Sequence, residues 1–347
     1  MGFTTFEHQD RILVALSGGV DSSVCVHILR SQGFAVEAAV IRFSDVHDSA
    51  VQAAQVAADQ LGIRLHVIHG EEAFDQHVAL PFCRSYCSGE TPNPCVVCNP
   101  MVKFRLLAEK ADELGIRLIA TGHYARIGQD EDGFWRVHNA ESSARDQSYM
   151  LYRLGQDILS RLVMPLGEFE KPMIREMAAD LGLASASAPD SMEICFIPDG
   201  DRAGYIEGRG FHSKEGHFIG PAGQDLGPHK GVLNYTVGQR KRLGIALGKP
   251  LFVQSIEESG NIQLAFSGDE FFSSMVLRDM ASASGKPLPA GEYLVKIRSA
   301  AKPIPCQFNG VDTVTFPEPV RAPAPGQSAV FYREDALMGG GFIARTE

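Results

Sequence analysis

Cysteine is the residue type in this sequence whose spacing most directly suggests chemistry. Seven cysteines are present, and four of them fall within sixteen residues: Cys83, Cys87, Cys95 and Cys98. An odd number of cysteines in a chain of 347 residues argues against a disulfide framework. The pair Cys95-x-x-Cys98 fits redox chemistry, a zinc site or an iron–sulfur cluster, and the pattern alone does not choose among them.

Cys98 and the distant Cys195 are the candidate reactive thiols. The Cys-x-x-Cys pair lies in a proline-bounded loop, and we expect a helix to begin just after it, at Met101. A helix N-terminus lowers the pKa of a nearby thiol, so we expect Cys98 to form a thiolate. On its own, Cys195 is more typical of a buried core residue. Cys83 and Cys87, at helical spacing, either join a metal site or, as we favour, pack as small side chains.

A second candidate site is the run Ser17-Gly18-Gly19-Val20-Asp21-Ser22. An apolar segment precedes it and a helical pattern follows it, so the run forms the turn between a strand and a helix. Glycines let the backbone approach an anion, which the first N–H groups of the helix then face. The spacing differs from that of a Walker loop, and the run contains no lysine. We expect a phosphate cradle; the alternative is an ordinary glycine turn.

Alternating strands and helices must position these residues. Short apolar strands are expected at 12–16, 35–41, 64–69 and 117–121, and helices at 21–32, 49–61 and 101–114. This order predicts an α/β doubly wound parallel sheet, in which ligands bind at the carboxyl ends of the strands. A helix is expected at 171–181. Short strands at 292–297, 312–316, 328–332 and 340–344 predict a small β-barrel at the C-terminus.

The charge distribution is uneven. A net charge of −10 argues weakly against a nucleic-acid partner. However, no acidic residue lies between Asp225 and Glu257, and this interval carries five basic residues: Lys230, Arg240, Lys241, Arg242 and Lys249. It forms either a phosphate-binding surface or a solvated loop. Without an apolar run of eighteen residues or a signal-peptide pattern, we expect a cytoplasmic protein with no membrane span.

Several motifs occur together in one order along the chain. They are SGGVDSS, TPNPCVVCN, ATGHYAR, RDQSYML, MEICFI, HKGVLNYTVGQRKRLGI and PGQSAVFY. Together they resemble the bacterial tRNA-specific 2-thiouridylases, PP-loop ATP pyrophosphatases that thiolate the wobble uridine of tRNA. The resemblance implies a PP-loop domain of the adenine nucleotide α-hydrolase type at 1–164, extended by helices to about 198. It also implies a small central domain at 199–272 and a tRNA-contacting β-barrel at 273–347.

The resemblance implies a role for each candidate residue. ATP binds at Ala15, Leu16, Ser17, Gly18, Gly19, Val20, Asp21, Ser22, Ile41 and Gly122, with Asp21 helping to hold Mg²⁺. The uridine C2 oxygen is adenylated, and sulfur then displaces AMP. In the persulfide scheme Cys195 carries the sulfur and Cys98 assists as nucleophile. Asn93, Pro94 and Cys95 line the target base, and further tRNA contacts are His123, Arg145, Asp146, Gln147, Arg298, Ser299 and Gln327.

One departure from the family pattern changes the expected sulfur chemistry. Many members carry Asp where this chain has Cys95, so Cys95, Cys98 and Cys195 offer three thiolates. A related thiolation branch holds a [4Fe–4S] cluster on three cysteines, and we expect such a cluster here in preference to a Cys98–Cys195 disulfide relay. The sulfur donor, a persulfide carrier protein or free sulfide, is left open.

Two alternative functions are also compatible with these motifs. One is another PP-loop thiolase or adenylating ligase that acts on a different nucleotide or a small metabolite. The barrel and the RDQSY and GQRK motifs speak against a small-molecule substrate. The other is a tRNA-binding iron–sulfur protein with an inactive PP-loop, against which the intact Ser17, Asp21 and Ser22 speak.

Overall fold

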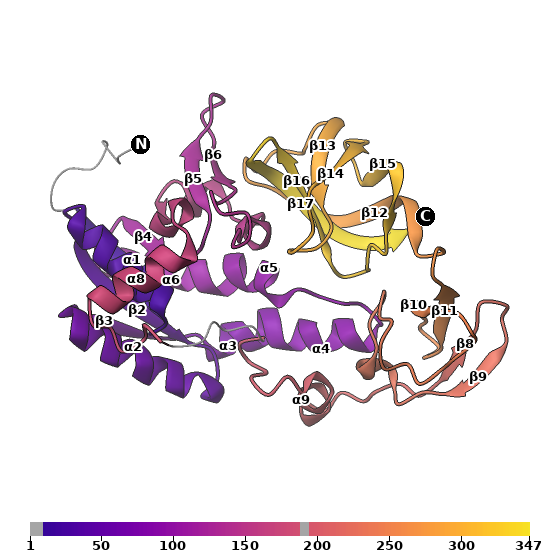
Figure 1. Cartoon of the computed structure of the whole chain (residues 1–347). Helices are drawn as coiled ribbons and strands as arrows, with labels where there is room; N and C mark the ends of the chain where they lie inside the picture. The colour runs from indigo at the N-terminus through magenta and orange to yellow at the C-terminus, as the bar shows by residue number, and fades with distance from the viewer. Residues whose placement is uncertain (1–9, 188–193) are drawn as a thin grey trace.

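The N-terminal part of the chain is built on a five-stranded parallel sheet. The computed structural model describes residues 10–187 and 194–347 (Figure 1). The sheet order is β3-β2-β1-β4-β7, with all neighbours parallel. Its strands are β1 (Arg11–Ala15), β2 (Ala35–Arg42), β3 (Leu65–His69), β4 (Leu118–Thr121) and β7 (Leu162–Val163).

Helices cover both faces of this sheet, which confirms the predicted doubly wound fold. Along β1, Ile12 and Val14 enter one core and Leu13 enters the other, because successive strand residues point to opposite faces. The first core includes residues of α1 (Val20–Ser31), α2 (Asp48–Leu61) and α8 (Lys171–Asp180). The second includes residues of α6 (Phe104–Glu113).

Two interrupted helices lie beside the sheet, and one of them carries the Cys-x-x-Cys pair. They are α3 (Glu71–Phe74), η2 (Asp75–Ala79) and α4 (Leu80–Cys87), then α5 (Pro94–Cys98), η3 (Asn99–Lys103) and α6. Both η2 and η3 are π-helical turns. The helix expected from Met101 therefore begins earlier, at Pro94. Asn93 caps it by accepting a hydrogen bond from the Cys95 N–H at 3.1 Å, and proline suits the first helical position.

The remaining short elements lie between the strands and helices of the N-terminal domain or after them. They are η1 (Asp45–His47), the hairpin β5 (Arg126–Gln129) and β6 (Trp135–His138), η4 (Ser148–Leu151), α7 (Gln156–Leu159), η5 (Pro165–Glu168) and α9 (Arg202–Gly208). A central four-stranded sheet of order β10-β11-β8-β9 follows. Its elements are β8 (His217–Ile219), β9 (Asp225–Pro228), η6 (Val232–Asn234), β10 (Leu251–Ile256) and β11 (Ile262–Phe266).

The C-terminal strands close into the predicted barrel, since β12 pairs with both β15 and β17. The strands are β12 (Phe271–Ser282), β13 (Gly291–Lys296), β14 (Ile304–Phe308), β15 (Thr313–Arg321), β16 (Ser328–Arg333) and β17 (Ala336–Thr346). β17 also pairs with β6, so the hairpin of the N-terminal domain extends the barrel sheet. Among the residues that the structure describes, no helix is long and apolar enough to cross a membrane.

A buried ion pair joins the barrel to the N-terminal domain. Lys296 on β13 donates to Asp146 at 2.6 Å, and their side chains are only 8% and 3% exposed. The Ser148 hydroxyl also donates to Asp146, at 2.9 Å. The barrel additionally holds the loop before the Cys-x-x-Cys helix: the Thr91 N–H donates to Pro325 O at 2.8 Å, and Gln327 donates to Thr91 O.

Replacing Lys296 with Met should destabilise this joint. Asp146 would remain buried without its cation, so we expect the free energy of unfolding to fall by about 3 kcal/mol. Urea unfolding measures the change. As a control, Arg105→Met removes an ion pair with Glu109 that is exposed on α6 and should cost less than about 1 kcal/mol. Equal losses in the two variants would contradict the structural role of the buried pair.

Candidate active site

The predicted phosphate cradle lies between β1 and α1, at the carboxyl edge of the sheet. Gly18 has φ +77°, and a β-carbon there would lie 2.4 Å from the carbonyl carbon of Ala53. Ser22 Oγ accepts from the Ser17 N–H at 3.1 Å and donates to Gly19 O at 3.1 Å, which closes the turn. The first N–H groups of α1 have no acceptor within the helix, so they are available to an anion.

The end of β4 closes one side of the cradle. A β-carbon on Gly122 would lie 3.1 Å from both Asp21 C and Ser22 N, so the two backbones nearly touch. Ala15 pairs with Ala39 on one side and Thr121 on the other, which brings the carboxyl ends of β1, β2 and β4 together. Ile41, near the end of β2, is only 8% exposed and packs in the core. The predicted ATP residues therefore lie along one edge of the sheet.

Asp21, the predicted Mg²⁺ residue, is held by two side chains that the sequence analysis missed. The Lys171 ammonium lies 2.7 Å from each carboxylate oxygen, and the Tyr124 hydroxyl donates to Oδ1 at 2.6 Å. Tyr124 belongs to the ATGHYAR motif, so its motif was noticed although its role was not. Lys171 gave no signal, because it is 150 residues from Asp21 in the sequence and only packing of α8 against α1 brings them together.

The three candidate thiols lie within electrostatic reach of one another. The protein around each sulfur disfavours the charged form and raises the pKa of Cys98 to about 12, of Cys195 to about 11, and of Cys95 above its usual value. Cys95 and Cys195 also raise the pKa of Cys98, and Lys103 lowers the pKa of all three thiols. The expected lowering of the Cys98 pKa was therefore wrong, because burial raises the pKa and the helix begins at Pro94, before Cys98.

The described thiols do not assemble a metal site. Within residues 10–187 and 194–347, no group of three or more His, Cys, Asp or Glu side chains is arranged to hold a metal ion. Cys83 is fully buried in an aromatic core with Phe82 and Phe196, as expected for a small packed side chain. The arrangement of the donors therefore gives no support to the [4Fe–4S] cluster expected on Cys95, Cys98 and Cys195.

Comparisons with known proteins decide the family. The chain matches the "tRNA methyl transferase HUP domain" at 10–199, the "tRNA methyl transferase PRC-barrel domain" at 206–264 and the "Aminomethyltransferase beta-barrel domain" at 273–343. It is 40% identical to the tRNA-specific 2-thiouridylase MnmA of Carboxydothermus hydrogenoformans, over 97% of this chain and 98% of the relative. The protein of that name from Clostridioides difficile is 38% identical over the same shares.

The chain belongs to the tRNA-specific 2-thiouridylase family. Among solved structures, a 4-thiouridine synthetase in complex with RNA and ATP is 19% identical, with a TM-score of 0.36. That match covers 55% of this chain and 46% of the other.

In this 2-thiouridylase family member, several side chains predicted to contact tRNA instead bind the protein backbone or another protein side chain. Asn93 caps α5, beginning at Pro94, and Gln327 binds the loop before it. Gln147 accepts from the Tyr124 N–H at 2.9 Å. Asp146 is occupied by Lys296. Contacts of these side chains with tRNA stay predictions.

His123 is buried between the cradle and the cysteine helix. Its ring stacks on Phe104 with centroids 5.8 Å apart, and its Nδ1 lies 2.9 Å from Thr121 Oγ1. Burial, aided by Lys103, keeps the His123 pKa well below its usual value, so the ring is neutral at physiological pH. Lys103 thus acts on the three thiols and on a residue next to the cradle, which links the two halves of the candidate site.

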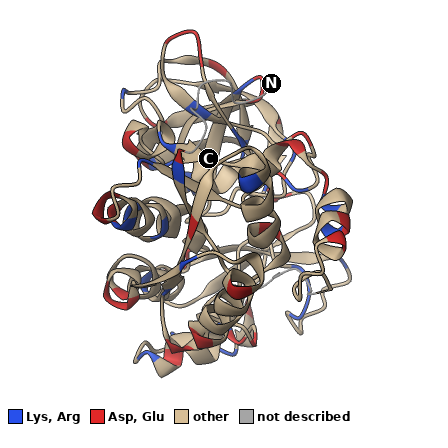
Figure 2. Cartoon of the chain, turned by 90° about the vertical axis from the view of Figure 1, so that its left-hand side faces the viewer, with Lys and Arg blue, Asp and Glu red and all other residues tan. Residues whose placement is uncertain are grey.

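One group of exposed basic residues in this 2-thiouridylase family member lies in the segment without acidic residues between Asp225 and Glu257. Arg240, Lys241 and Arg242 are exposed, and Gly238 beside them lies against the Arg298 guanidinium of the barrel. Arg298 and Arg145 are exposed, and Ser299 is partly so. By contrast, Figure 2 shows acidic and basic positions interspersed over the helices of the N-terminal domain. The one-signed segment is therefore the better candidate surface for phosphate groups.

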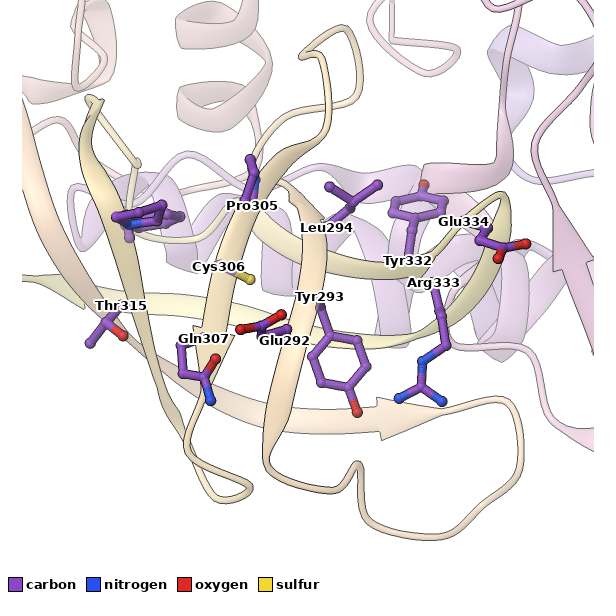
Figure 3. A pocket seen from close by; sticks show the side chains of 12 residues that line it. Glu292, Tyr293, Leu294, Pro305, Cys306, Gln307, Thr315, Tyr332, Arg333 and Glu334 are labelled. Atoms are coloured by element: carbon purple, nitrogen blue, oxygen red, sulfur yellow. The ribbon is translucent and has the colours of Figure 1, made fainter.

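A separate hollow of about 570 Å³ lies on the barrel of the 2-thiouridylase family member. Figure 3 shows Glu292, Tyr293, Gln307 and Arg333 around it, on strands β13, β14 and β16. None of the predicted site residues lines this hollow. It therefore contributes nothing to the cradle or to the thiols.

The cradle can be tested through two glycines that share a left-handed backbone. Gly62 has φ +61° and open space around its β-carbon position, whereas Gly18 has φ +77° and no such space. We expect Gly62→Ala to cost about 1 kcal/mol of unfolding free energy and Gly18→Ala roughly 3 kcal/mol, with loss of Mg²⁺–ATP binding. Urea unfolding and calorimetric titration measure both. Equal effects in the two variants would mean that close packing at Gly18 is not required.

The raised thiol pKa values predict how the cysteines react. Since thiolate is the nucleophile, alkylation of Cys98 and Cys195 by iodoacetamide should keep accelerating through pH 10, without the plateau of an ordinary thiol. Mass spectrometry resolves each site. Lys103→Met should slow alkylation of Cys95, Cys98 and Cys195, whereas Lys110→Met, on α6 beside Glu113, should not. A plateau below about pH 8.5 at Cys98 would show that its pKa is not raised.

Proposed function

We propose that this protein catalyses the ATP-dependent 2-thiolation of the wobble uridine of tRNA. The observation that carries the proposal is the link between the cradle and the thiols through η3. Gly122 packs on Asp21 and Ser22, His123 follows it and stacks on Phe104, and Lys103 acts on Cys98. Such a reaction needs a nucleotide and sulfur nucleophiles at one edge of the sheet, and this arrangement supports both. The family membership reported above supports the same activity.

ATP fits the cradle. The backbone at Gly18 leaves no room for a side chain and is tightly packed at Gly122, and the N–H groups of the first turn of α1 face the carboxyl edge. Asp21 offers an oxygen ligand of the kind that Mg²⁺ prefers. Bound Mg²⁺ would neutralise charge on the phosphates while the uridine C2 oxygen takes up the adenylyl group. The backbone N–H groups of this chain hold the phosphates, and the glycines keep side chains out of the turn.

For the sulfur step we propose the two-cysteine relay, which is supported by the charge effect of Cys195 on the pKa of Cys98. A persulfide on Cys195 attacks C2 with its terminal sulfur and AMP leaves. The Cys98 thiolate then attacks the Cys195 sulfur, which forms a Cys98–Cys195 disulfide and leaves the transferred sulfur on uridine. The persulfide sulfur comes from a carrier protein or from sulfide with an oxidant, and a thiol reductant restores the two cysteines. No step of this scheme requires Cys95 as a metal ligand.

The tRNA is proposed to contact exposed basic side chains of the central segment and the barrel. Arg240, Lys241 and Arg242 are exposed and follow Gly238, which lies against Arg298, and Arg145 is exposed on the N-terminal domain. Arginine and lysine bind the phosphate backbone whatever the sequence, so this surface supplies affinity. Recognition of the uridine itself is proposed for Asn93, Pro94 and Cys95, at the start of the cysteine helix.

An anaerobic thiolation assay with ATP, Mg²⁺, unmodified tRNA and a persulfide donor tests the proposal. Cys98→Ala and Cys195→Ala should each lower thiouridine formation by about 100-fold or more, while tRNA-dependent AMP release continues. Cys95→Ala should retain thiolation. The thiolation activity of purified protein should not rise with its iron content.

Three outcomes would overturn parts of this scheme. Thiolation that needs Cys95 and rises with iron content would establish the cluster in place of the relay. Absence of tRNA-dependent AMP release from the wild type would support the rival hypothesis of a tRNA-binding iron–sulfur protein with an inactive PP-loop. AMP release with another nucleotide or a small metabolite in place of tRNA would support the rival PP-loop enzyme.

A further inference from the structure

The contact between Lys171 and Asp21 places a buried cation where a metal ion is expected. Lys171 is the first residue of α8, and its side chain is only 7% exposed. Its ammonium lies 2.7 Å from both oxygens of the Asp21 carboxylate, which is itself one-third exposed. The Tyr124 hydroxyl adds a third short donor at 2.6 Å. The most accessible carboxylate of the cradle is thus engaged by protein donors.

Stability alone is a poor explanation for this cation. Removing an ammonium from water is costly, and a buried ion pair often stabilises a fold no better than apolar side chains of similar size. The neighbouring core of α1 and α8 is apolar, with Val24 and Ile174 fully buried. A methionine at position 171 would suit such a core. The presence of a charged lysine beside Asp21 therefore indicates a role in binding the ligand of the cradle.

We propose that Lys171 is a mobile counter-ion of the nucleotide site, which neutralises Asp21 in the empty protein and moves to the phosphates when Mg²⁺–ATP binds. The proposal rests on the proposed function only in taking ATP as the ligand of the cradle. A divalent cation on Asp21 repels an ammonium bound to the same oxygens, so the two compete for the carboxylate. The triphosphate supplies several negative oxygens to which the displaced ammonium then donates.

The geometry allows this exchange without movement of the helices. Asp21 lies in the first turn of α1, where the free N–H groups would hold the phosphates, so the phosphates lie beside its carboxylate. Lysine has a flexible four-carbon stem, and its ammonium can turn through a few ångströms about a fixed backbone. Tyr124 keeps Asp21 in place meanwhile, because its hydroxyl donates to Oδ1 independently of Lys171. Lys171 therefore serves Asp21 and the phosphates in turn.

Two binding measurements on Lys171→Met test the proposal, because its two effects have opposite signs. Without nucleotide, Mn²⁺ binding followed by electron paramagnetic resonance should tighten by about fivefold or more, since the competing cation is gone. With Mg²⁺ present, binding of the non-hydrolysable α,β-methylene analogue of ATP should weaken by about tenfold, the loss of one charged hydrogen bond. Lys171→Arg, which keeps the charge, should retain most of the nucleotide affinity.

Lys296→Met is the control, because Lys296 on the barrel is about as buried as Lys171 and is also paired with an aspartate. It should lower stability while leaving both binding constants unchanged. If Lys171→Met weakens Mn²⁺ and nucleotide together, or alters only stability, the ammonium is a structural partner and the proposal is wrong.

A second variant covers the case in which Lys171→Met does not fold. In Asp21→Asn the ammonium loses the negative charge of Asp21, so metal-free nucleotide should bind more tightly than to the wild type; unchanged or weaker binding would overturn the proposal. Thiolation by the wild type is measured on the same preparations. The binding pattern without thiouridine would refute the proposed function alone, and thiouridine without the pattern would refute the role of Lys171 alone.

Discussion

The close approach of two backbones, between the end of β4 and the first turn of α1, is the constraint on which the candidate site depends. A β-carbon on Gly122 would lie only 3.1 Å from Asp21 C and Ser22 N, which is tighter than ordinary van der Waals contact. This contact sets the directions of the next two side chains: His123 turns toward the cysteine helix, and Tyr124 turns toward the cradle. A larger residue at position 122 would push the two backbones apart by a few tenths of an ångström, at the point where the nucleotide and sulfur halves of the site meet.

The environment of the thiols sets a second condition for the chemistry. A thiol whose pKa is about 12, as at Cys98, is rarely ionised at neutral pH, but its thiolate is a stronger nucleophile than that of an acidic thiol. The protein thus keeps the sulfur protonated and unreactive in its free state. Lys103 is the cation whose charge opposes this effect at all three sulfurs. In the proposed relay, the Cys98 thiol must therefore lose its proton before it attacks the Cys195 sulfur.

The sequence predicted those parts of the structure that local patterns determine. The strand–glycine turn–helix pattern at residues 12–32 and the short strands of the barrel appear as expected, because alternation and turn residues act over a few positions. Contacts between distant segments were not predictable in this way. Lys171 reaches Asp21 through helix packing, and Asp146, interpreted as an RNA contact, is buried by Lys296 from the barrel. The start of the cysteine helix was missed because Asn93 and Pro94 were interpreted as loop residues, although both are favourable at a helix N-terminus.

The position of the barrel depends on the same long-range contacts and has a consequence for the cysteines. Both backbone groups of Thr91 are bound by barrel residues, and two residues later Asn93 caps the helix that carries Cys95 and Cys98. The ion pair between Lys296 and Asp146 fixes the barrel to the domain that holds the cradle. The loop before the thiols is thus fixed from one side by the barrel and from the other by α5. A change in barrel position on binding RNA would reach the cysteine helix directly, through two hydrogen bonds to one residue.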